Sequence, residues 1–135
     1  MKKKKIGDKL VIRLEKGEEI VSNLEQALGE ADVRAGSFQA IGAVSEATLG
    51  HYSLVSKEYS EREFNQPLEI VSLQGTITRE GVHPHACLGT KEMETFGGHL
   101  VEATVAATCE ILVAPEPGGL ERYHDEEIGL DLLDI

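Results

Sequence analysis

Three histidines, His83, His85 and His99, are the residues of this chain whose type and spacing are best suited to chemistry. In an extended segment, residues two apart point to the same side, so the imidazoles of His83 and His85 can reach one ion. Pro84 between them cannot donate a hydrogen bond to a neighbouring strand, which favours an edge or rim of a sheet. His99 follows two glycines and begins the longest strand pattern of the chain. It would face the other two histidines if the two strands were neighbours.

Three neutral imidazoles with a fourth position open are the ligand set of catalytic zinc. The sequence therefore predicts one zinc-like divalent ion held by His83, His85 and His99, although imidazole also suits nickel, copper and iron. The residues alone leave an alternative open, in which His83 and His85 are exposed polar residues and His99 only fills space. Cys87 is a candidate fourth ligand because it follows His85 by two residues, but it also reads as a small core residue.

The remaining chemical groups of the chain are interpreted as surface or strand residues. His51 and His124 are isolated, and residues 61–63 read as the alternating charges of a strand with one wet face. Glu63 is the candidate acid or base if the histidine site is catalytic. The acidic C-terminal run lacks the spacing of a calcium loop, and neither a phosphate-binding loop nor a nucleophile elbow occurs.

Composition limits the partners of this chain. Its 135 residues suit one domain, and 24 acidic against 13 basic residues give a net charge of -11. Such a surface repels nucleic acids and anionic membranes, so neither is expected as a direct partner. The lysines at positions 2–5 are predicted to belong to a basic, solvated tail over residues 1–9, followed by a single domain over residues 10–135.

The chain is expected in the cytoplasm. No apolar run approaches the ~20 residues that a membrane helix needs, and no apolar stretch follows the N-terminal lysines as in a secretory signal. The two cysteines do not make a disulfide framework.

Hydrophobic periodicity predicts an α+β fold. Apolar residues at helical spacing indicate one helix over residues 18–31. Period-two patterns indicate strands over residues 10–14, 37–42, 46–54, 57–64, 68–79, 82–88 and 99–114, with residues 91–98 as a loop. Short turns between these strands favour antiparallel pairing. We therefore expect a mainly antiparallel sheet with the one principal helix packed on a face.

Five segments in a fixed order make the chain similar to one family. It resembles the PPC (plants and prokaryotes conserved) domain, in its prokaryotic stand-alone form, from about Leu10 to Leu133. The segments are residues 13–19, 41–49, 68–75, 83–86 and 97–101. The resemblance implies a homotrimer and a metal site at His83, His85 and His99. Plant relatives carry an AT-hook that binds DNA, and this sequence has none.

Three classes of function are compatible with these observations. The first is a metal-binding homotrimer that binds or senses a small molecule. The second is a zinc-dependent hydrolase or lyase acting on a small polar substrate. The third is a DNA-associated regulatory or protein-interaction module that acts through partners. The sequence does not decide whether the chain is an enzyme, because no complete catalytic motif accompanies the histidines.

Overall fold

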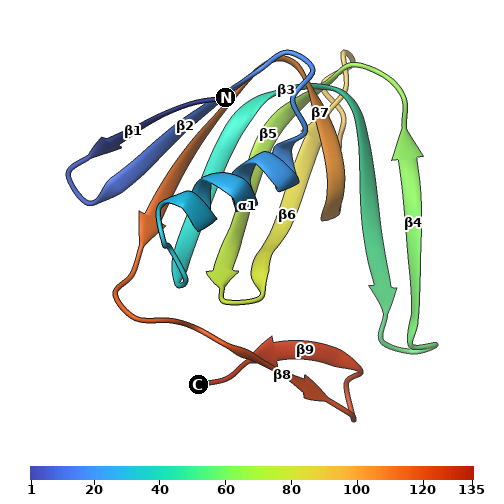
Figure 1. The fold of residues 1–135 in the computed structure, drawn as a ribbon. Coiled ribbons are helices and arrows are strands. Elements are labelled where there is room, and N and C mark those ends of the chain that lie inside the picture. The colour runs from blue at the N-terminus through green and yellow to red at the C-terminus, as the bar shows by residue number, and fades with distance from the viewer.

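Alternating apolar and polar residues place most of this chain in strands, and a computed structural model describing residues 1–135 shows how they pair (Figure 1). Seven strands form one antiparallel sheet in the order β1-β2-β7-β6-β5-β3-β4, and two more form a separate hairpin. The one helix is α1 (Ile20–Glu30). The predicted antiparallel sheet with a single principal helix is thereby confirmed. The strands are β1 (Lys2–Ile6), β2 (Lys9–Glu15), β3 (Gly36–Ser53), β4 (Glu58–Phe64), β5 (Leu68–Thr78), β6 (Gly81–Gly89), β7 (Thr95–Pro115), β8 (Arg122–Asp125) and β9 (Leu130–Leu133).

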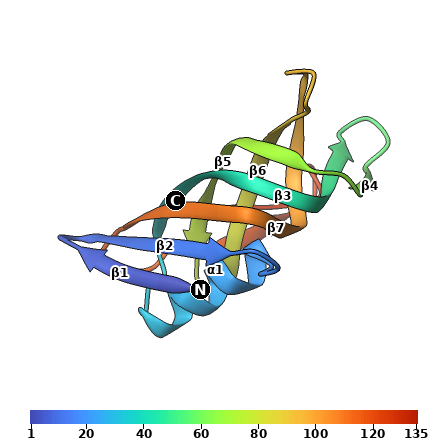
Figure 2. The ribbon, with the colours of Figure 1, turned by 90° about the horizontal axis from the view of Figure 1, so that it is seen from above.

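The two longest strands, β3 and β7, run side by side and organise the sheet (Figures 1 and 2). β3 also pairs with β5, β5 with β6, and β6 with β7. These four strands therefore form a closed ring of paired strands. The sequence predicted two strands where β3 is continuous. At Gly42 the register shifts, and a Cβ there would overlap the carbonyl oxygen of Thr108 in β7. A glycine therefore lets β3 bend through this point without breaking.

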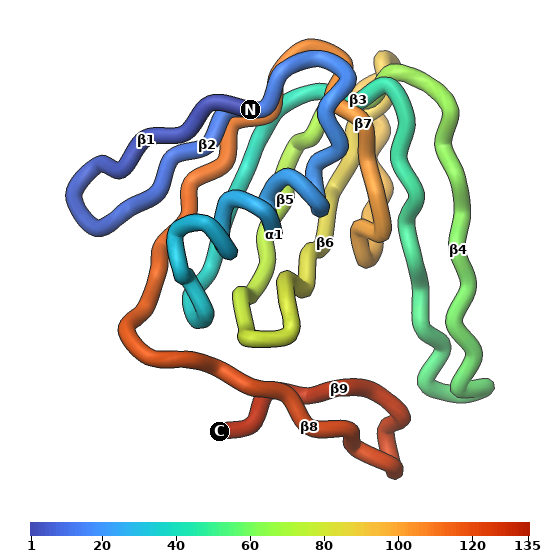
Figure 3. Tube along the Cα trace, in the orientation of Figure 1, coloured from blue at the N-terminus to red at the C-terminus, as the bar shows by residue number.

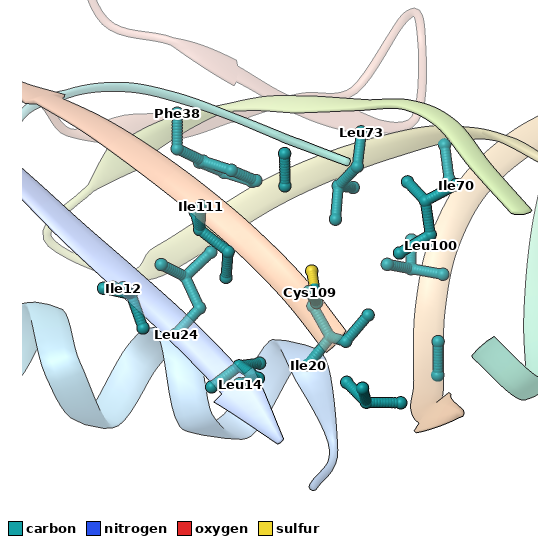
Figure 4. Close-up of a cluster of buried hydrophobic side chains, with 14 of the residues drawn as sticks. Ile12, Leu14, Ile20, Leu24, Phe38, Ile70, Leu73, Leu100, Cys109 and Ile111 are labelled. Carbon is teal, nitrogen blue, oxygen red and sulfur yellow. The ribbon is translucent and has the colours of Figure 1, made fainter. Parts of the chain in front are cut away.

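The hydrophobic core lies between α1 and one face of the sheet (Figure 4). The helix buries Ile20, Leu24, Ala27 and Leu28, which recur at the spacing of one helical face. Ile20 and Leu24 lie beside side chains of β2 and β7 in the close-up, and aliphatic residues fill most of the core. The opposite face of the sheet is left free of the helix.

Glu19 connects α1 to the sheet. It is the N-cap residue, and its carboxylate accepts hydrogen bonds from the backbone N–H groups of Val21 (2.9 Å) and Ser22 (2.6 Å) and from the Ser22 hydroxyl (2.5 Å). The backbone N–H of Ala103 in β7 also donates to it, at 3.2 Å. Burial acts to raise the pKa of Glu19, but the hydrogen bonds outweigh burial and hold the pKa below its usual range.

We expect Glu19→Ala to lower the free energy of unfolding by about 1–2 kcal/mol at neutral pH, because it removes the cap and the contact to β7. The folded pKa lies below the unfolded one, so this stabilisation is full above the unfolded pKa and is lost as the pH falls through the folded pKa. The difference from wild type should therefore shrink in acid. Denaturant titrations at pH 7 and in acid measure it, with the exposed Glu25 of the same helix, changed to Ala, as control. An equal loss in the control would contradict the explanation.

The N-terminus differs from the expected solvated tail. The lysines at positions 2–5 lie in β1, which pairs with β2 while all its residues remain exposed. Lys2 forms an ion pair with Glu15 at 3.0 Å, and Lys3 forms one with Glu30 of the helix. The charge pattern correctly indicated an exposed segment. It did not predict a strand, because a run of lysines lacks the apolar alternation by which strands are recognised.

Two more segments differ from the sequence-based prediction. β7 begins at Thr95, inside the expected loop, and the acidic C-terminal run contains the hairpin β8–β9. The tube trace shows this hairpin set apart from the sheet, at the end of the segment that follows β7 (Figure 3). The hairpin is small and acidic, which explains why composition indicated only a solvated face.

Candidate metal centre

The histidines lie on the face of the sheet that α1 leaves free. In β6 the exposed His83 and His85 alternate with the buried Pro84 and Ala86, so the imidazoles point away from the core. His99 of β7 is the direct register partner of His85. The two strands are neighbours, which is the condition under which His99 faces the other two histidines, and three side chains that are up to 16 positions apart in sequence meet at one place.

The distances within the cluster fit one metal ion. The Nε2 atoms of His83 and His85 are 3.3 Å apart, and candidate ligand atoms of all three histidines lie within 4.8 Å of one another. The ring centroids are separated by 5.1 Å (His83–His85), 5.1 Å (His83–His99) and 5.7 Å (His85–His99). Two nitrogens bound to one tetrahedral zinc at ~2.0–2.1 Å would be roughly 3.3 Å apart. The donor set and its spacing therefore suit zinc or a similar divalent ion.

The surroundings of His83 and His99 favour the neutral imidazole, the form that binds metal. Burial lowers the pKa of His83, and the nearby positive charge of Arg122 lowers it further, followed by His99 and His85. Burial also lowers the pKa of His99, assisted by His85 and opposed by Glu61. These side chains therefore hold free nitrogen lone pairs at neutral pH.

A cavity of about 1030 Å³ lies between the histidines and the β8–β9 hairpin. The hairpin is attached to the tip of β3 and β4, where the Tyr52 hydroxyl donates to the carbonyl of Ile128 (3.0 Å) and the Lys57 ammonium to that of Glu127 (2.7 Å). His83 and His85 also border a second hollow of about 650 Å³, further along the free face of the sheet. The candidate site is thus accessible, and the hairpin covers one side of it.

A phenol borders the cavity together with His99, and a carboxyl lies two strands away in the same row. The register places Glu61, Gly50 and His99 in one row across β4, β3 and β7. Because Gly50 has no side chain, Tyr59 occupies the space above it, and a Cβ at Gly50 would overlap the Tyr59 hydroxyl. Burial and then the charge of Glu61 raise the pKa of Tyr59. Glu61 and Tyr59 can therefore accept or donate protons next to the histidines.

Glu63, the acid or base candidate from the sequence, lies elsewhere. It is the register partner of Thr48 and borders a separate hollow with Glu46 and Glu102. The position beside His99 belongs to Glu61. Period-two alternation places both Glu61 and Glu63 on one side of β4. Only the pairing of β4 with β3 determines which of the two lies in the row of His99.

The other sequence candidates are outside the cluster. Cys87 contributes no atom to the group of potential ligands. His51 is exposed and borders the cavity. His124 pairs with Asp131 of the hairpin at 2.8 Å, and that hydrogen bond raises the pKa of His124. The three histidines are thus the group of potential metal ligands that the fold brings together.

The fold and the histidine cluster define a small β-rich domain with a group of potential metal ligands. Comparison with known families identifies the family to which this domain belongs. The chain belongs to the Plants and Prokaryotes Conserved (PCC) domain family, whose model matches residues 1–116. The resemblance to the PPC family is thereby confirmed.

Solved structures agree with this assignment. A Bacteroides thetaiotaomicron protein suggested to bind DNA is 30% identical, with a TM-score of 0.94 over 98% of this chain and 96% of the other. A metal-containing protein from Archaeoglobus fulgidus is 35% identical, with a TM-score of 0.87 over 97% and 96%. A PPC protein from Pyrococcus horikoshii is 27% identical, with a TM-score of 0.84 over 96% and 92%.

Curated relatives are much longer than this chain. It is 30% identical over 108 residues to the bifunctional protein GlmU of a Synechococcus strain, a match that covers 78% of this chain and 16% of the relative. The chain thus corresponds to a small part of that protein.

The structure contains no helix with the length and apolar character needed to cross a membrane.

Proposed function

We propose that this chain holds one zinc-like divalent ion with His83, His85 and His99 and uses the adjoining cavity to bind or sense a small molecule. The observation that carries the proposal is the gathering of three imidazole ligand atoms within 4.8 Å of one another. The related protein from Archaeoglobus fulgidus is metal-containing, which adds support. When bound, an ion with three protein ligands supplies a Lewis acid with an open position for a ligand atom.

Elemental analysis tests the metal directly. We expect untagged protein, purified without chelators, to contain about one divalent ion per chain, since a three-histidine site holds one ion. Prolonged dialysis against EDTA should remove the ion while the circular dichroism spectrum is retained, because the core does not include the site. Metal-free protein that takes up no zinc, nickel, copper, cobalt or iron when these are added would overturn the proposal.

A zinc-dependent hydrolase or lyase acting on a small polar substrate is the second candidate, and Glu61 beside His99 favours it. An enzyme needs a proton donor or acceptor near the metal site, and Glu61 and Tyr59 could act in this way. Glu61→Gln in metal-loaded protein tests this role against a panel of small esters, amides and oxo acids. Turnover by wild type that disappears in the variant, with metal content unchanged, would support an enzyme.

A DNA-associated module is the third candidate, and direct DNA binding is not expected of it. With a net charge of -11 the isolated protein should not bind duplex DNA appreciably at physiological salt. The lysines of β1 are the basic cluster, and Lys2 and Lys3 are already engaged in ion pairs. Gel-shift and anisotropy titrations measure binding, with lysines 2–5 changed to Gln as control. Submicromolar, salt-resistant binding that survives this change would contradict the charge argument.

The chain is also proposed to form a homotrimer through the free face of its sheet. Ile41, Val71 and Leu112 are 60%, 53% and 45% exposed on that face. Gln39 and Ile41 of β3 pair in register with Leu112 and Glu110 of β7, which puts Leu112 diagonally next to Ile41. Contiguous exposed aliphatic residues of this kind mark interaction surfaces. The PPC resemblance implies that two further copies of this chain cover this face.

A further inference from the structure

Arg122 is a half-buried cation that the proposed metal site does not explain. It is the first residue of β8 and borders the cavity together with the three histidines. Its guanidinium donates to the Thr76 hydroxyl from Nη2 and to the Asp131 carbonyl from Nη1, both at 2.9 Å. These two bonds fix the group in place and leave three of its five N–H donors unused.

No carboxylate forms an ion pair with this guanidinium. Arg122 takes part in none of the ion pairs of the chain. Glu80 lies near Arg122 but forms no ion pair with its guanidinium. Arg122 and His83 border the same cavity. A fixed positive charge beside a site for a divalent cation is unfavourable by Coulomb's law unless an anion lies between them.

The cavity walls indicate an organic anion. The hairpin contributes Leu130 and Leu132, and Val82 and Tyr52 face the cavity from the sheet. Apolar walls with a few converging polar groups are typical of sites for organic ligands. The planar fork of an arginine matches the two oxygens of a carboxylate.

We infer that the small-molecule ligand carries a carboxylate that Arg122 binds, while a second polar group of the same ligand reaches the open side of the histidine cluster. This inference rests on the proposed metal site. It narrows the small molecules that would bind in the cavity to small organic acids. It assigns a specificity-determining role to the C-terminal hairpin, which lies beyond the residues 1–116 that the family model matches.

Calorimetric titration of the metal-loaded protein tests the inference. The probes are the diacids malonate, succinate and glutarate, their neutral diamides, and inorganic phosphate. We expect at least one diacid to bind with micromolar to millimolar affinity, and its diamide to bind at least about 10-fold more weakly, because a charge-assisted hydrogen bond is lost. Arg122→Gln should weaken the diacid by about 10-fold or more and leave the diamide unchanged. Arg122→Lys keeps the charge but not the fork, so it should give a smaller loss.

Arg79→Gln is the matched control. Arg79 pairs with Glu121 at 3.1 Å close to the start of the hairpin and does not border the cavity, so the same change of charge there should not alter diacid binding. Metal content is measured in each sample before titration. A protein without metal contradicts the proposed function, whereas a metal-loaded protein without carboxylate preference contradicts this inference alone.

Four results would overturn the inference. One is that no diacid binds metal-loaded wild type at millimolar concentration. Another is that Arg122→Gln and Arg122→Lys bind the diacid as tightly as wild type. A third is equal weakening by Arg79→Gln. The last is that phosphate binds more tightly than every diacid in an Arg122-dependent way, which would assign the site to a phosphate group.

Discussion

Replacement of His99 by alanine is expected to reduce the bound metal from about one ion per chain to below about one tenth of that, while the protein stays folded. His99 is the one histidine of the cluster that lies in β7, and it stands directly opposite His85 in the sheet register. Without it two imidazoles of β6 remain, and two neutral ligands hold zinc far less tightly than three. The metal content of dialysed protein, measured by elemental analysis, checks this result.

His51→Ala is the matched control for that experiment. His51 is an exposed histidine that borders the same cavity but lies outside the cluster of ligand atoms. Its removal should leave the metal content unchanged. Equal metal in wild type and His99→Ala, or equal loss in His51→Ala, would contradict the assignment of the ligands.

Leu112→Asp is expected to convert a trimer into single chains. Wild type should scatter light with three times the 14.7 kDa mass of one chain at micromolar concentration, and the variant with one times that mass. Leu112 lies next to Ile41 on the face that α1 leaves free, where a subunit contact would bury it. A carboxylate buried there without a partner would cost several kcal/mol, enough to dissociate a contact of ordinary size.

The control for assembly is Val55→Asp. Val55 is 98% exposed in the turn between β3 and β4, away from the patch formed by Ile41, Val71 and Leu112. It should leave the mass unchanged. A monomeric wild type, or a Leu112→Asp variant that remains trimeric, would contradict an interface on this face.

The proposed metal centre, the free face of the sheet and the hairpin adjoin one another. His85 and Leu112 border the same 650 Å³ hollow, so the proposed subunit contact and the proposed metal site are adjacent. The hairpin covers the other side, with Arg122 directed to the cavity. The proposed ligand binding and the proposed assembly would therefore influence each other, so titrations should be compared at fixed protein concentration.

Local patterns in the sequence determined the element types and the ligand pair. Period two over residues 82–88 placed His83 and His85 on one side, and the structure keeps them there as the exposed residues of β6. The apolar spacing over residues 18–31 predicted α1 within two residues at each end. These features depend only on contacts between neighbours along the chain, so the sequence carries them directly.

Tertiary structure alone decided which glutamate lies in the row of His99 and what covers the histidines. Glu61 and Glu63 are equivalent by alternation, and the pairing of β4 with β3 puts Glu61 in the row of His99. Arg122 borders the cavity of the histidines only because the C-terminal hairpin folds back and hydrogen-bonds to Thr76, 46 positions away. Strand register and the docking of a distant hairpin are set by the packing of the whole sheet, and no local periodicity encodes them.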